Sequence, residues 1–451
     1  MSAGKKSRQR RRRRALSFAQ SSRQFLTPEV FKQAHQARKA TRRSPRWNVQ
    51  PLIFVLLTMT WCCGDSNAER FEAARAYYIG CHETRKRPGK TVQGFQAALA
   101  KLPLRVLRGV SASVRKQLLA TLGDRLGTGP WKVFGCDGSR VECPRSAELE
   151  QRMGRAGKEN SAPTAWITAF VHLRTGLLWT WRMGKGTASE QRHLCQMLPE
   201  LPAGALIVTD AAYRGYELTQ EILAAGLSFL VRVGSATRLY TREQQPLEDF
   251  QDGEVYYWPL ERQKKKLPPI HLRLIRVRNS KNKKDVWLLT NVLDGKQLSA
   301  AMAGQFYRWR WENEGLFRTY KQTLKKVKLV SRTVRLVHRE LEGSLLAVQL
   351  MLAQATLRLH PRSSLWDEPD VASPRKVLRE IRRDIAAAQT GRRRAFNHRV
   401  AQAKRERRSR ESPKEKREWP RRKPHKPPGA PKISTLNDKQ KSLLHKLETA
   451  A

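Results

Sequence analysis

The hydrophobic pattern of the chain changes period at Trp131, and this change constrains the fold more than any other feature. Between residues 48 and 128 the apolar residues recur at helical spacing, as in SASVRKQLLATLGDRL. From Trp131 the segment WKVFGCDGSRVEC indicates a strand and turn, and TAWITAFVHLRTGLLWTWRMG indicates a hairpin that turns at Arg-Thr-Gly. We therefore expect a helical region followed by a region built on strands.

A strand, a helix and a second strand follow the hairpin. They are ALIVTD, which ends in Asp210, then YELTQEILAAG and SFLVRV. This order predicts an α/β layer. Residues 236–297 differ, because VYYWPL, IHLRLIRVR and VWLLTNV are strand patterns joined by charged turns, with no strong helix among them. We interpret this span as a β-rich insertion, and residues 298–328 as one long helix.

The charge of the chain points to a polyanionic partner. Lys and Arg number 89 against 39 Asp and Glu, for a net charge of +50. Residues 1–14 carry eight basic and no acidic side chains, and residues 391–427 carry 16 basic against four acidic. These two segments hold 20 of the 50 charges, so about 30 lie on the foldable part. Solvated tails on a neutral domain are thereby excluded, and nucleic acid is the expected partner.

The cysteines and the longest apolar run favour a reduced cytoplasmic protein. The six cysteines form no C-x-x-C pair and have no zinc-finger spacing. The run from Leu52 to Cys63 is about 12 residues, short of the ~18 to 20 that span a bilayer. It also lies too far inside the chain for a signal peptide. We expect a buried helix there and no membrane association.

A stripe of polar residues marks the segment FYRWRWENEGLFRTYKQTL. At about 100° per residue, Tyr307, Arg310, Glu314 and Lys321 fall within a stripe about 60° wide on one helix. An apolar face lies beside it, made of Phe306, Trp309, Leu316, Phe317, Tyr320, Leu324 and Val327. The stripe holds a carboxylate between a phenol and two cations. The alternative is an ordinary ion pair between Arg310 and Glu314 on a solvated face.

Two further acids lie where α/β proteins often carry their chemistry. Asp137 is in the first strand and Asp210 follows a central one. The alternatives are a turn aspartate before Gly138 and a helix N-cap at Asp210. Together with Glu314 they make three carboxylates, enough to hold two hard cations such as Mg²⁺. Two such ions support an in-line phosphoryl displacement. This set and the basic surface suggest cutting or joining of a nucleic-acid backbone.

The spacing Tyr307-(2)-Arg310-(3)-Glu314-(6)-Lys321 resembles the Y-R-E-K signature of the insertion-sequence-four family of bacterial DDE transposases. The blocks DGS, GTASE (ending at Glu190), TDAAYRGY, WLLTN and ELEGSLLA follow the order of that family. The resemblance covers residues 130–355. It implies an RNase H-like domain in which Asp137, Asp210 and Glu314 are catalytic and bind two Mg²⁺ ions, with Mn²⁺ as a substitute.

The resemblance also implies DNA contacts. Tyr307, Arg310 and Lys321 would hold phosphates at the element's end, and Trp311 would lie against DNA. Family members use a tryptophan of the insertion to take an extruded base, and Trp287 is the nearest candidate here. Its register is displaced by one residue, which on a strand reverses the face. The alternative for Trp287 is a core tryptophan.

The predicted fold class is α/β: an RNase H-like catalytic domain interrupted by a β-rich insertion, with an N-terminal helical domain and basic tails. The predicted domains are a disordered basic tail (1–47), a helical DNA-binding domain (48–128), the catalytic domain in two parts (129–235 and 298–365), the insertion (236–297), and a basic C-terminal region, partly helical and then disordered (366–451).

The predicted function is cut-and-paste transposition of an insertion sequence, with end cleavage, hairpin formation and opening, and strand transfer. The expected partners are the terminal inverted repeats and target DNA, with a homodimer in the synaptic complex, in the bacterial cytoplasm at the nucleoid. Two alternatives stay open. One is a repurposed or inactive DNA-binding protein, and the other is an RNase H-like nuclease without strand transfer.

Overall fold

The computed structural model describes residues 15–37, 47–82, 87–155, 160–244, 246–278, 285–359, 369–390, 395–405 and 429–449. The chain divides into two compact units, each described here by itself. The helical unit comprises Met1–Gln117, Glu342–His360 and Ala372–Lys404, and the sheet unit comprises Leu118–Leu341, Pro361–Val371 and Arg405–Ala451. No helix within the described ranges is long and apolar enough to cross a membrane.

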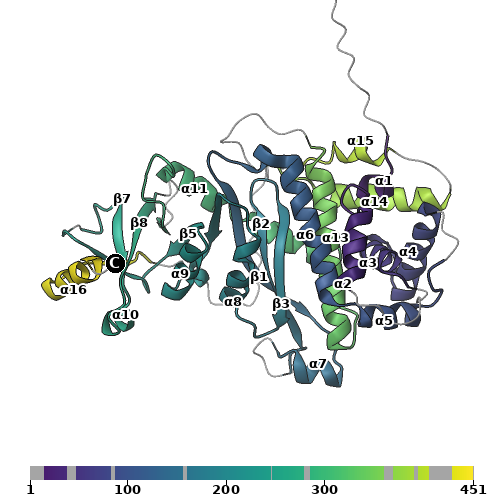
Figure 1. Cartoon of the computed structure of the whole chain (residues 1–451), viewed down its shortest axis with the longest axis horizontal. Helices are drawn as coiled ribbons and strands as arrows, with labels where there is room; N and C mark the ends of the chain where they lie inside the picture. Colours follow the sequence, from purple (N-terminus) through teal and green to yellow (C-terminus); the bar gives the residue numbers. More distant parts are fainter. Residues whose placement is uncertain are drawn as a thin grey trace, which may run out of the picture. The chain divides into compact units, whose positions relative to one another are not determined.

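The helical unit is built from helices that the apolar pattern largely predicted (Figure 1). They are α1 (Phe18–Ser22), α2 (Pro28–Ala37), α3 (Val49–Trp61), α4 (Asn67–Cys81), α5 (Val92–Lys101), the first part of α6 (Leu104–Leu122), the second part of α13 (Val334–Thr356), α14 (Pro374–Gln389) and α15 (Phe396–Val400). Side-chain caps start several of them, including Ser66 before α4 and Thr91 before α5.

Helix α3 is the centre of this unit. It is apolar all round and buried along almost its whole length, as expected for the run that begins at Leu52. Its Leu56 meets Gly343 of α13, where an added Cβ would lie 2.6 Å from Leu56 Cδ2. Only glycine permits so close an approach. The expectation of a buried helix at this position is confirmed.

The prediction of a disordered tail over residues 1–47 is wrong for residues 15–37, which include α1 and α2. Phe18 packs edge-on against Trp61 at 4.9 Å and against Phe396 at 5.1 Å between ring centroids. The basic residues of the segment obscured a short apolar pattern whose partners lie in other helices of the unit. Residues 1–14 and 38–46 lie outside the described residues.

The sheet unit is a mixed α/β structure with a ten-stranded sheet among the described residues, in the order β10-β6-β7-β8-β9-β5-β4-β1-β2-β3. The strands are β1 (Lys132–Glu142), β2 (Thr164–His172), β3 (Leu177–Lys185), β4 (Ala205–Thr209), β5 (Ser228–Val233), β6 (Arg238–Thr241), β7 (Asp252–Tyr257), β8 (Ile270–Val277), β9 (Val286–Thr290) and β10 (Lys432–Thr435).

The central strands match the sequence prediction. β2 and β3 form the expected hairpin, whose turn ends at Gly176 with a φ of +67°. β4, α9 (Tyr216–Ala224) and β5 form the expected β-α-β passage, since β4 pairs in parallel with both β1 and β5. The α/β layer is therefore confirmed.

The two faces of β1 meet different helices. A Cβ added at Gly135 would lie 2.6 Å from Asn313 Nδ2 on α12 (Glu312–Arg318), and one added at Gly138 would lie 2.8 Å from Glu190 Cδ on α8 (Glu190–Met197). Because alternate residues of a strand point to opposite faces, α12 and α8 lie on opposite sides of β1. Asp137 shares the face of Gly135.

The strands of residues 236–297 continue the same sheet. β9 pairs with β5, and β8, β7 and β6 follow outward; the short helix α10 (Leu260–Lys264) interrupts the strand pattern. Leu288 of β9 and Ile275 of β8 share one hydrophobic core with Leu206 of β4 and Phe306. The span is β-rich as expected, and it shares the core of the central strands.

The predicted long helix over residues 298–328 is divided. α11 (Ala300–Trp309) ends before Arg310 and Trp311, α12 follows, and a π-helix covers η4 (Thr319–Thr323). The Arg310 and Trp311 amides donate to carbonyls three residues back, which tightens the backbone, and the π turn then adds a residue. Side-chain directions calculated at 100° per residue for one continuous helix are therefore wrong for residues beyond the break. Val327, expected on the apolar face, is 57% exposed.

The prediction of disorder towards the C-terminus is wrong for residues 429–449. β10 pairs in parallel with β6, and α16 (Asp438–Thr449) follows it. Leu436 and Leu444 pack with Trp258, Tyr240 and Tyr256. An edge strand offers unpaired backbone groups to any segment of suitable pattern, which the basic composition did not reveal.

Candidate active site

The two predicted aspartates lie on neighbouring parallel strands, Asp137 within β1 and Asp210 directly after β4. Gly135 of β1 is paired with Val208 of β4, so the register continued by two residues sets Asp137 beside Asp210. Burial raises the pKa of Asp137 to about 6, against the opposing bond from the Gly138 N–H, and the charge of Asp210 contributes to the rise. The parallel pairing of β1 with β4 thus brings together two acids from distant parts of the chain.

Asp210 also caps a short helix. Its Oδ1 accepts a hydrogen bond from the Ala212 N–H at 2.9 Å, at the start of η3 (Ala211–Tyr213). The alternative that Asp210 is a helix N-cap is therefore correct, and the cap uses its Oδ1. It does not compete with a ligand role, because the cap orients the carboxylate beside Asp137.

Arg310 links the aspartates to the Y-R-E-K segment. Its charge opposes the rise in the pKa of Asp137. The guanidinium carbon lies 5.0 Å from the Trp311 ring centroid and 5.6 Å from that of Tyr307. Its Nε is buried without a hydrogen-bond partner, while Trp311 is 60% exposed. This cation therefore lies beside exposed aromatic surface.

Lys321 reaches the same strand from the π-helix. Its Nζ donates a hydrogen bond to Ser139 Oγ at 2.7 Å, and Ser139 shares the Asp137 face of β1. Burial lowers the pKa of Lys321. A cation is therefore held two residues along the strand from Asp137.

Glu314 is not grouped with Asp137 and Asp210 in the described part of the chain. It is exposed on α12, next to the buried Asn313 that contacts Gly135. Within the described ranges, no three or more His, Cys, Asp and Glu side chains are grouped to hold a metal ion. The alternative ion pair between Arg310 and Glu314 is also absent from the described part of the chain, because the helix break lies between them.

The structure adds Glu190, which the residue patterns did not single out as a site residue. Burial raises its pKa, and the charge of Asp210 adds to this while the nearby Tyr213 and Arg140 oppose it. The buried Tyr213 hydroxyl lies next to this carboxylate. Arg140 lies over the Trp166 ring at 4.3 Å and donates to the Gly186 carbonyl at 3.2 Å. The GTASE block contained Glu190, but only β1 packing reveals its position.

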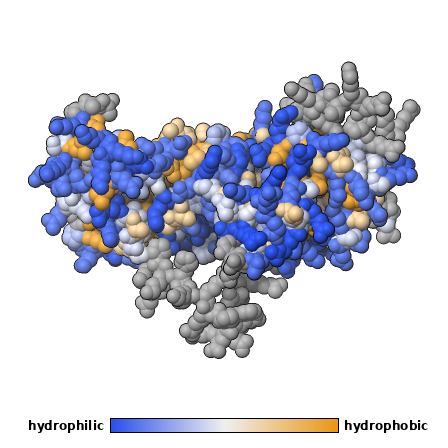
Figure 2. All heavy atoms as spheres, turned by 90° about the horizontal axis from the view of Figure 1, so that it is seen from below, coloured by the Kyte–Doolittle hydropathy of each residue, from blue (hydrophilic) through white to orange (hydrophobic). Residues whose placement is uncertain are grey.

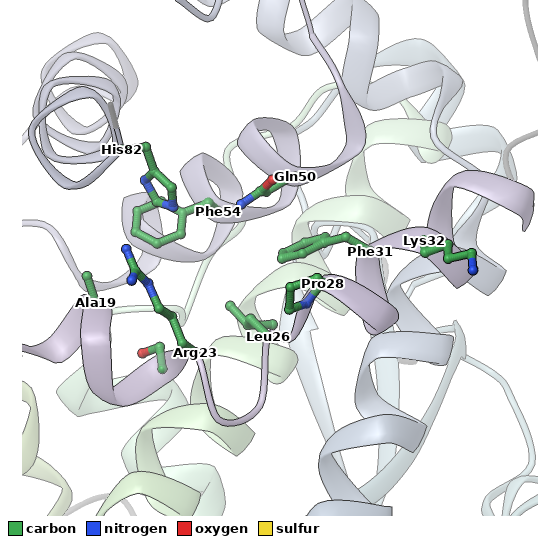
Figure 3. Close-up of a pocket in the computed structure, with 10 residues that line it drawn as sticks. Ala19, Arg23, Leu26, Pro28, Phe31, Lys32, Gln50, Phe54 and His82 are labelled. Atoms are coloured by element: carbon green, nitrogen blue, oxygen red, sulfur yellow. The ribbon is translucent and has the colours of Figure 1, made fainter. Parts of the chain in front are cut away.

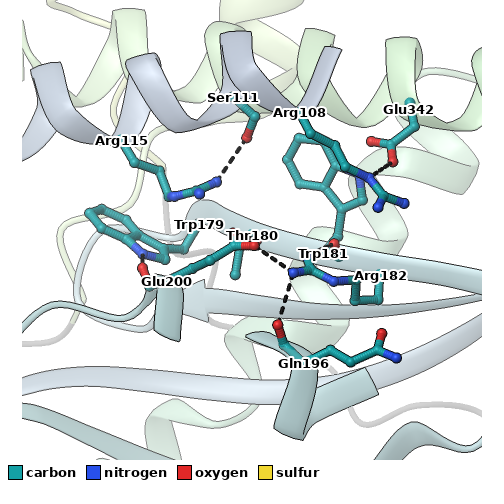
Figure 4. A network of polar contacts seen from close by, with 10 residues as sticks. All are labelled: Arg108, Ser111, Arg115, Trp179, Thr180, Trp181, Arg182, Gln196, Glu200 and Glu342. Carbon is teal, nitrogen blue, oxygen red and sulfur yellow. Dashed lines mark hydrogen bonds and ion pairs between the residues drawn. The ribbon is translucent and has the colours of Figure 1, made fainter. Parts of the chain in front are cut away.

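A polar network holds the far end of α8 against β3 (Figure 4). Arg182 of β3 forms an ion pair with Glu200 at 2.5 Å and donates to the Gln196 carbonyl at 2.9 Å. Trp179 donates to the Glu200 carbonyl at 2.9 Å, and Thr180 donates to its carboxylate. Helix α8, which begins at Glu190, is thus fastened to the sheet at its other end.

Trp287 lies in the core of the sheet. It is 4% exposed, faces Phe250 at 6.2 Å between centroids, and lies under the Arg276 guanidinium at 5.3 Å. Arg276 is itself paired with Asp285 at 2.6 Å. This is the environment of a core tryptophan, and a base-binding role for Trp287 stays a prediction.

The donor set of Asp137 and Asp210 fits a divalent cation. Both are oxygen ligands of the kind that Mg²⁺ prefers. Burial first, and the charge of Asp210 second, raise the pKa of Asp137, and a bound cation would offset both effects.

Comparison with known proteins gives a family match over the central part of the chain. The family model described as the transposase DDE domain matches residues 133–350, the span that carries both aspartates and the Y-R-E-K segment. No curated protein matches the chain. One solved structure, the piggyBac transposase synaptic complex with hairpin DNA, has 12% identity over 82% of this chain and 80% of its own, with a TM-score of 0.40. The domain match supports a DDE transposase.

Proposed function

We propose that the protein is a cut-and-paste DNA transposase of the insertion-sequence-four type, with an RNase H-like catalytic core. The observation that carries the proposal is the register of β1 and β4, which sets Asp137 beside Asp210 within the matched domain. The Y-R-E-K segment reaches the same strand through Lys321. A pair of acids flanked by phosphate-binding cations is suited to phosphodiester chemistry.

Each residue of the proposed site has a distinct role. Asp137, Asp210 and Glu314 would hold two Mg²⁺ ions, which supply activation of the attacking oxygen and stabilisation of the leaving one. Arg310 and Lys321 bind backbone phosphates, Arg310 as a planar fork and Lys321 as a point charge. Tyr307 and Trp311 flank the Arg310 guanidinium and present aromatic surface to DNA.

The reaction proceeds by successive displacements at phosphorus. Water attacks at the element's end and releases a 3′-hydroxyl. That hydroxyl attacks the opposite strand, which closes a DNA hairpin and frees the flanking DNA. A second water opens the hairpin, and the 3′-hydroxyl then joins target DNA. Acting on two ends requires at least two copies of the chain in the synaptic complex.

A second candidate is a transposase-derived protein that binds DNA without cutting it. The position of Glu314 favours it, since the described residues hold two acids together rather than three. Against it, Asn313 packs α12 directly on β1, which keeps Glu314 on the helix that faces the Asp137 side of the strand.

The test is cleavage of the DNA that flanks the gene, with Mg²⁺ or Mn²⁺. Wild-type protein should cut at the element's ends and join them to target DNA. Asp137→Ala, Asp210→Ala and Glu314→Ala should each lower cleavage by roughly 10³-fold or more. Glu261→Ala, an exposed acid of α10, is the control and should cut normally. Wild-type rates in the three variants would reject the assignment, and cleavage without joining would indicate a nuclease.

A further inference from the structure

The helical unit contains a cavity that the proposed catalysis does not use. Its volume is about 650 Å³, within the range of small-ligand pockets. α1 and α2, the turn between them, α3 and the end of α4 supply the lining (Figure 3). The lining residues are Ala19, Ser22, Arg23, Leu26, Pro28, Phe31, Lys32, Gln50, Phe54 and His82.

One wall of the cavity is aromatic. Phe54 meets the His82 ring edge-on at 5.2 Å, and Tyr78 stacks on His82 at 4.3 Å and meets Phe54 edge-on at 5.4 Å between ring centroids. The His82 Nδ1 lies 3.0 Å from the Tyr78 carbonyl, which fixes the ring. Phe31 lines the cavity from α2. These rings form a rigid surface of the kind on which a planar group stacks.

The charges of the cavity are of one sign. Arg23 and Lys32 line it, and no acid does among the described residues. In the described part of the chain the Arg23 side chain makes no ion pair, and its guanidinium points towards Phe54 and His82 (Figure 3). Residues 1–14, with eight basic and no acidic side chains, directly precede α1 in the sequence. The occupant should therefore be an anion with a planar apolar part.

We propose that this cavity binds an unpaired nucleotide of DNA. The base stacks against the Phe31 and Phe54 side, Gln50 offers an amide to its edge, and Arg23 and Lys32 hold the adjacent phosphates. Aromatic stacking combined with cations is the usual means of binding single-stranded DNA. A duplex is too wide for the cavity, so the site discriminates unpaired from paired nucleotides. The proposal rests on the proposed function only in taking DNA as the substrate.

The experiment separates this site from catalysis. Full-length Asp137→Asn protein in EDTA is mixed with a DNA duplex that carries one bulged 5-iodouracil, or with the same duplex fully paired. After irradiation, cross-linked peptides are mapped by mass spectrometry. The bulged base should cross-link within residues 15–37 or 47–82, at Phe31, Phe54 or His82, and the paired base should not. The result does not depend on whether wild-type protein cuts DNA.

Two variants test the cavity itself. Leu26→Trp fills it without changing charge, and Arg23→Ala removes the cation; each should lower cross-linking of the bulged base roughly tenfold, since a stacked base contributes on that order. Lys101→Ala, an exposed cation of the same unit outside the lining, is the control and should cross-link as before. Circular dichroism confirms folding, and Ala19→Met replaces any variant that unfolds. Cross-links elsewhere, equal cross-linking of paired DNA, or insensitivity to both variants would overturn the proposal.

Discussion

Glu340 and Asp137 are both acids of the sheet unit, but the residues around them shift their pKa values in opposite directions. Burial alone would raise the pKa of Glu340, but the Lys326 charge and bonds from Lys326 and Ser331 hold that pKa below its usual value. Glu340 accepts from Lys326 Nζ at 2.8 Å and from the Val330 and Ser331 amides. Asp137 has a raised pKa and an acidic neighbour. Partners within the protein stabilise the charged form of Glu340, whereas the charged form of Asp137 would be stabilised by a bound cation.

This contrast separates a structural ion pair from a functional site. Both acids have perturbed pKa values, so perturbation by itself does not identify function. The direction of the pKa shift distinguishes the two cases. A carboxylate with partners is stabilised in its charged form, whereas the carboxylate of an empty cation site is not. Substitutions at the two acids should therefore change stability in opposite directions.

Glu340→Gln should destabilise the protein by about 3–5 kcal/mol, because it leaves Lys326 charged and unpaired in a buried position. Urea unfolding at neutral pH measures it. Glu142→Gln is the matched control, since its pair with Lys328 at 3.1 Å is exposed and should contribute less than about 1 kcal/mol. Equal effects of the two substitutions would contradict the structural role of Glu340.

The Glu340 effect should also depend on pH. Its pKa is lower in the folded state, so its stabilisation is present above the usual value of 4.5 and is lost as the pH falls through the lowered value. The difference in unfolding free energy between wild type and Glu340→Gln should therefore be constant near neutral pH and shrink below about 4.5. A difference that grows on acidification would reverse the assigned sign.

Gly138→Ala should destabilise by about 1–3 kcal/mol, because the new Cβ would lie 2.7 Å from Trp166 Cζ2 and 2.8 Å from Glu190 Cδ. Adding Glu190→Ala should recover part of this loss, since one of the two contacts disappears. Thermal unfolding of the single and double variants gives the coupling. Strict additivity would show that Glu190 does not press on β1.

Asp137→Asn should have the opposite sign from Glu340→Gln. In EDTA at neutral pH it should leave stability unchanged or raise it by about 1 kcal/mol, because it removes a charge that burial and Asp210 disfavour. DNA cleavage should nevertheless be lost. Urea unfolding and the cleavage assay on one preparation measure both, and a large destabilisation would make Asp137 structural.

Arg310→Ala and Lys321→Ala should have the smallest effect, on binding of DNA ends. Each should weaken binding and reduce the slope of log K against log salt by about one released counterion. Lys264→Ala, at the end of α10, is the control. Slopes that match wild type in both variants would argue against phosphate contact at either residue.

Prediction from sequence succeeded where the determinants are local. The pattern of apolar residues placed α3, the β2–β3 hairpin and the β4-α9-β5 passage, because burial of a helix or strand decides which neighbouring residues are apolar. It also placed Asp137 in the first strand and Asp210 after a central one. Glu190 was missed, because the sequence around it does not show that it packs against Gly138 of β1.

The α/β class, the basic composition and the residues of the Y-R-E-K segment follow from the amino-acid order alone. The folded chain is needed to see that residues 236–297 extend the central sheet, that β10 joins its edge, and that a break after Trp309 separates Arg310 from Glu314. Strand pairing and helix tightening depend on partners far along the chain. The energies that choose them arise from contacts that no local pattern encodes.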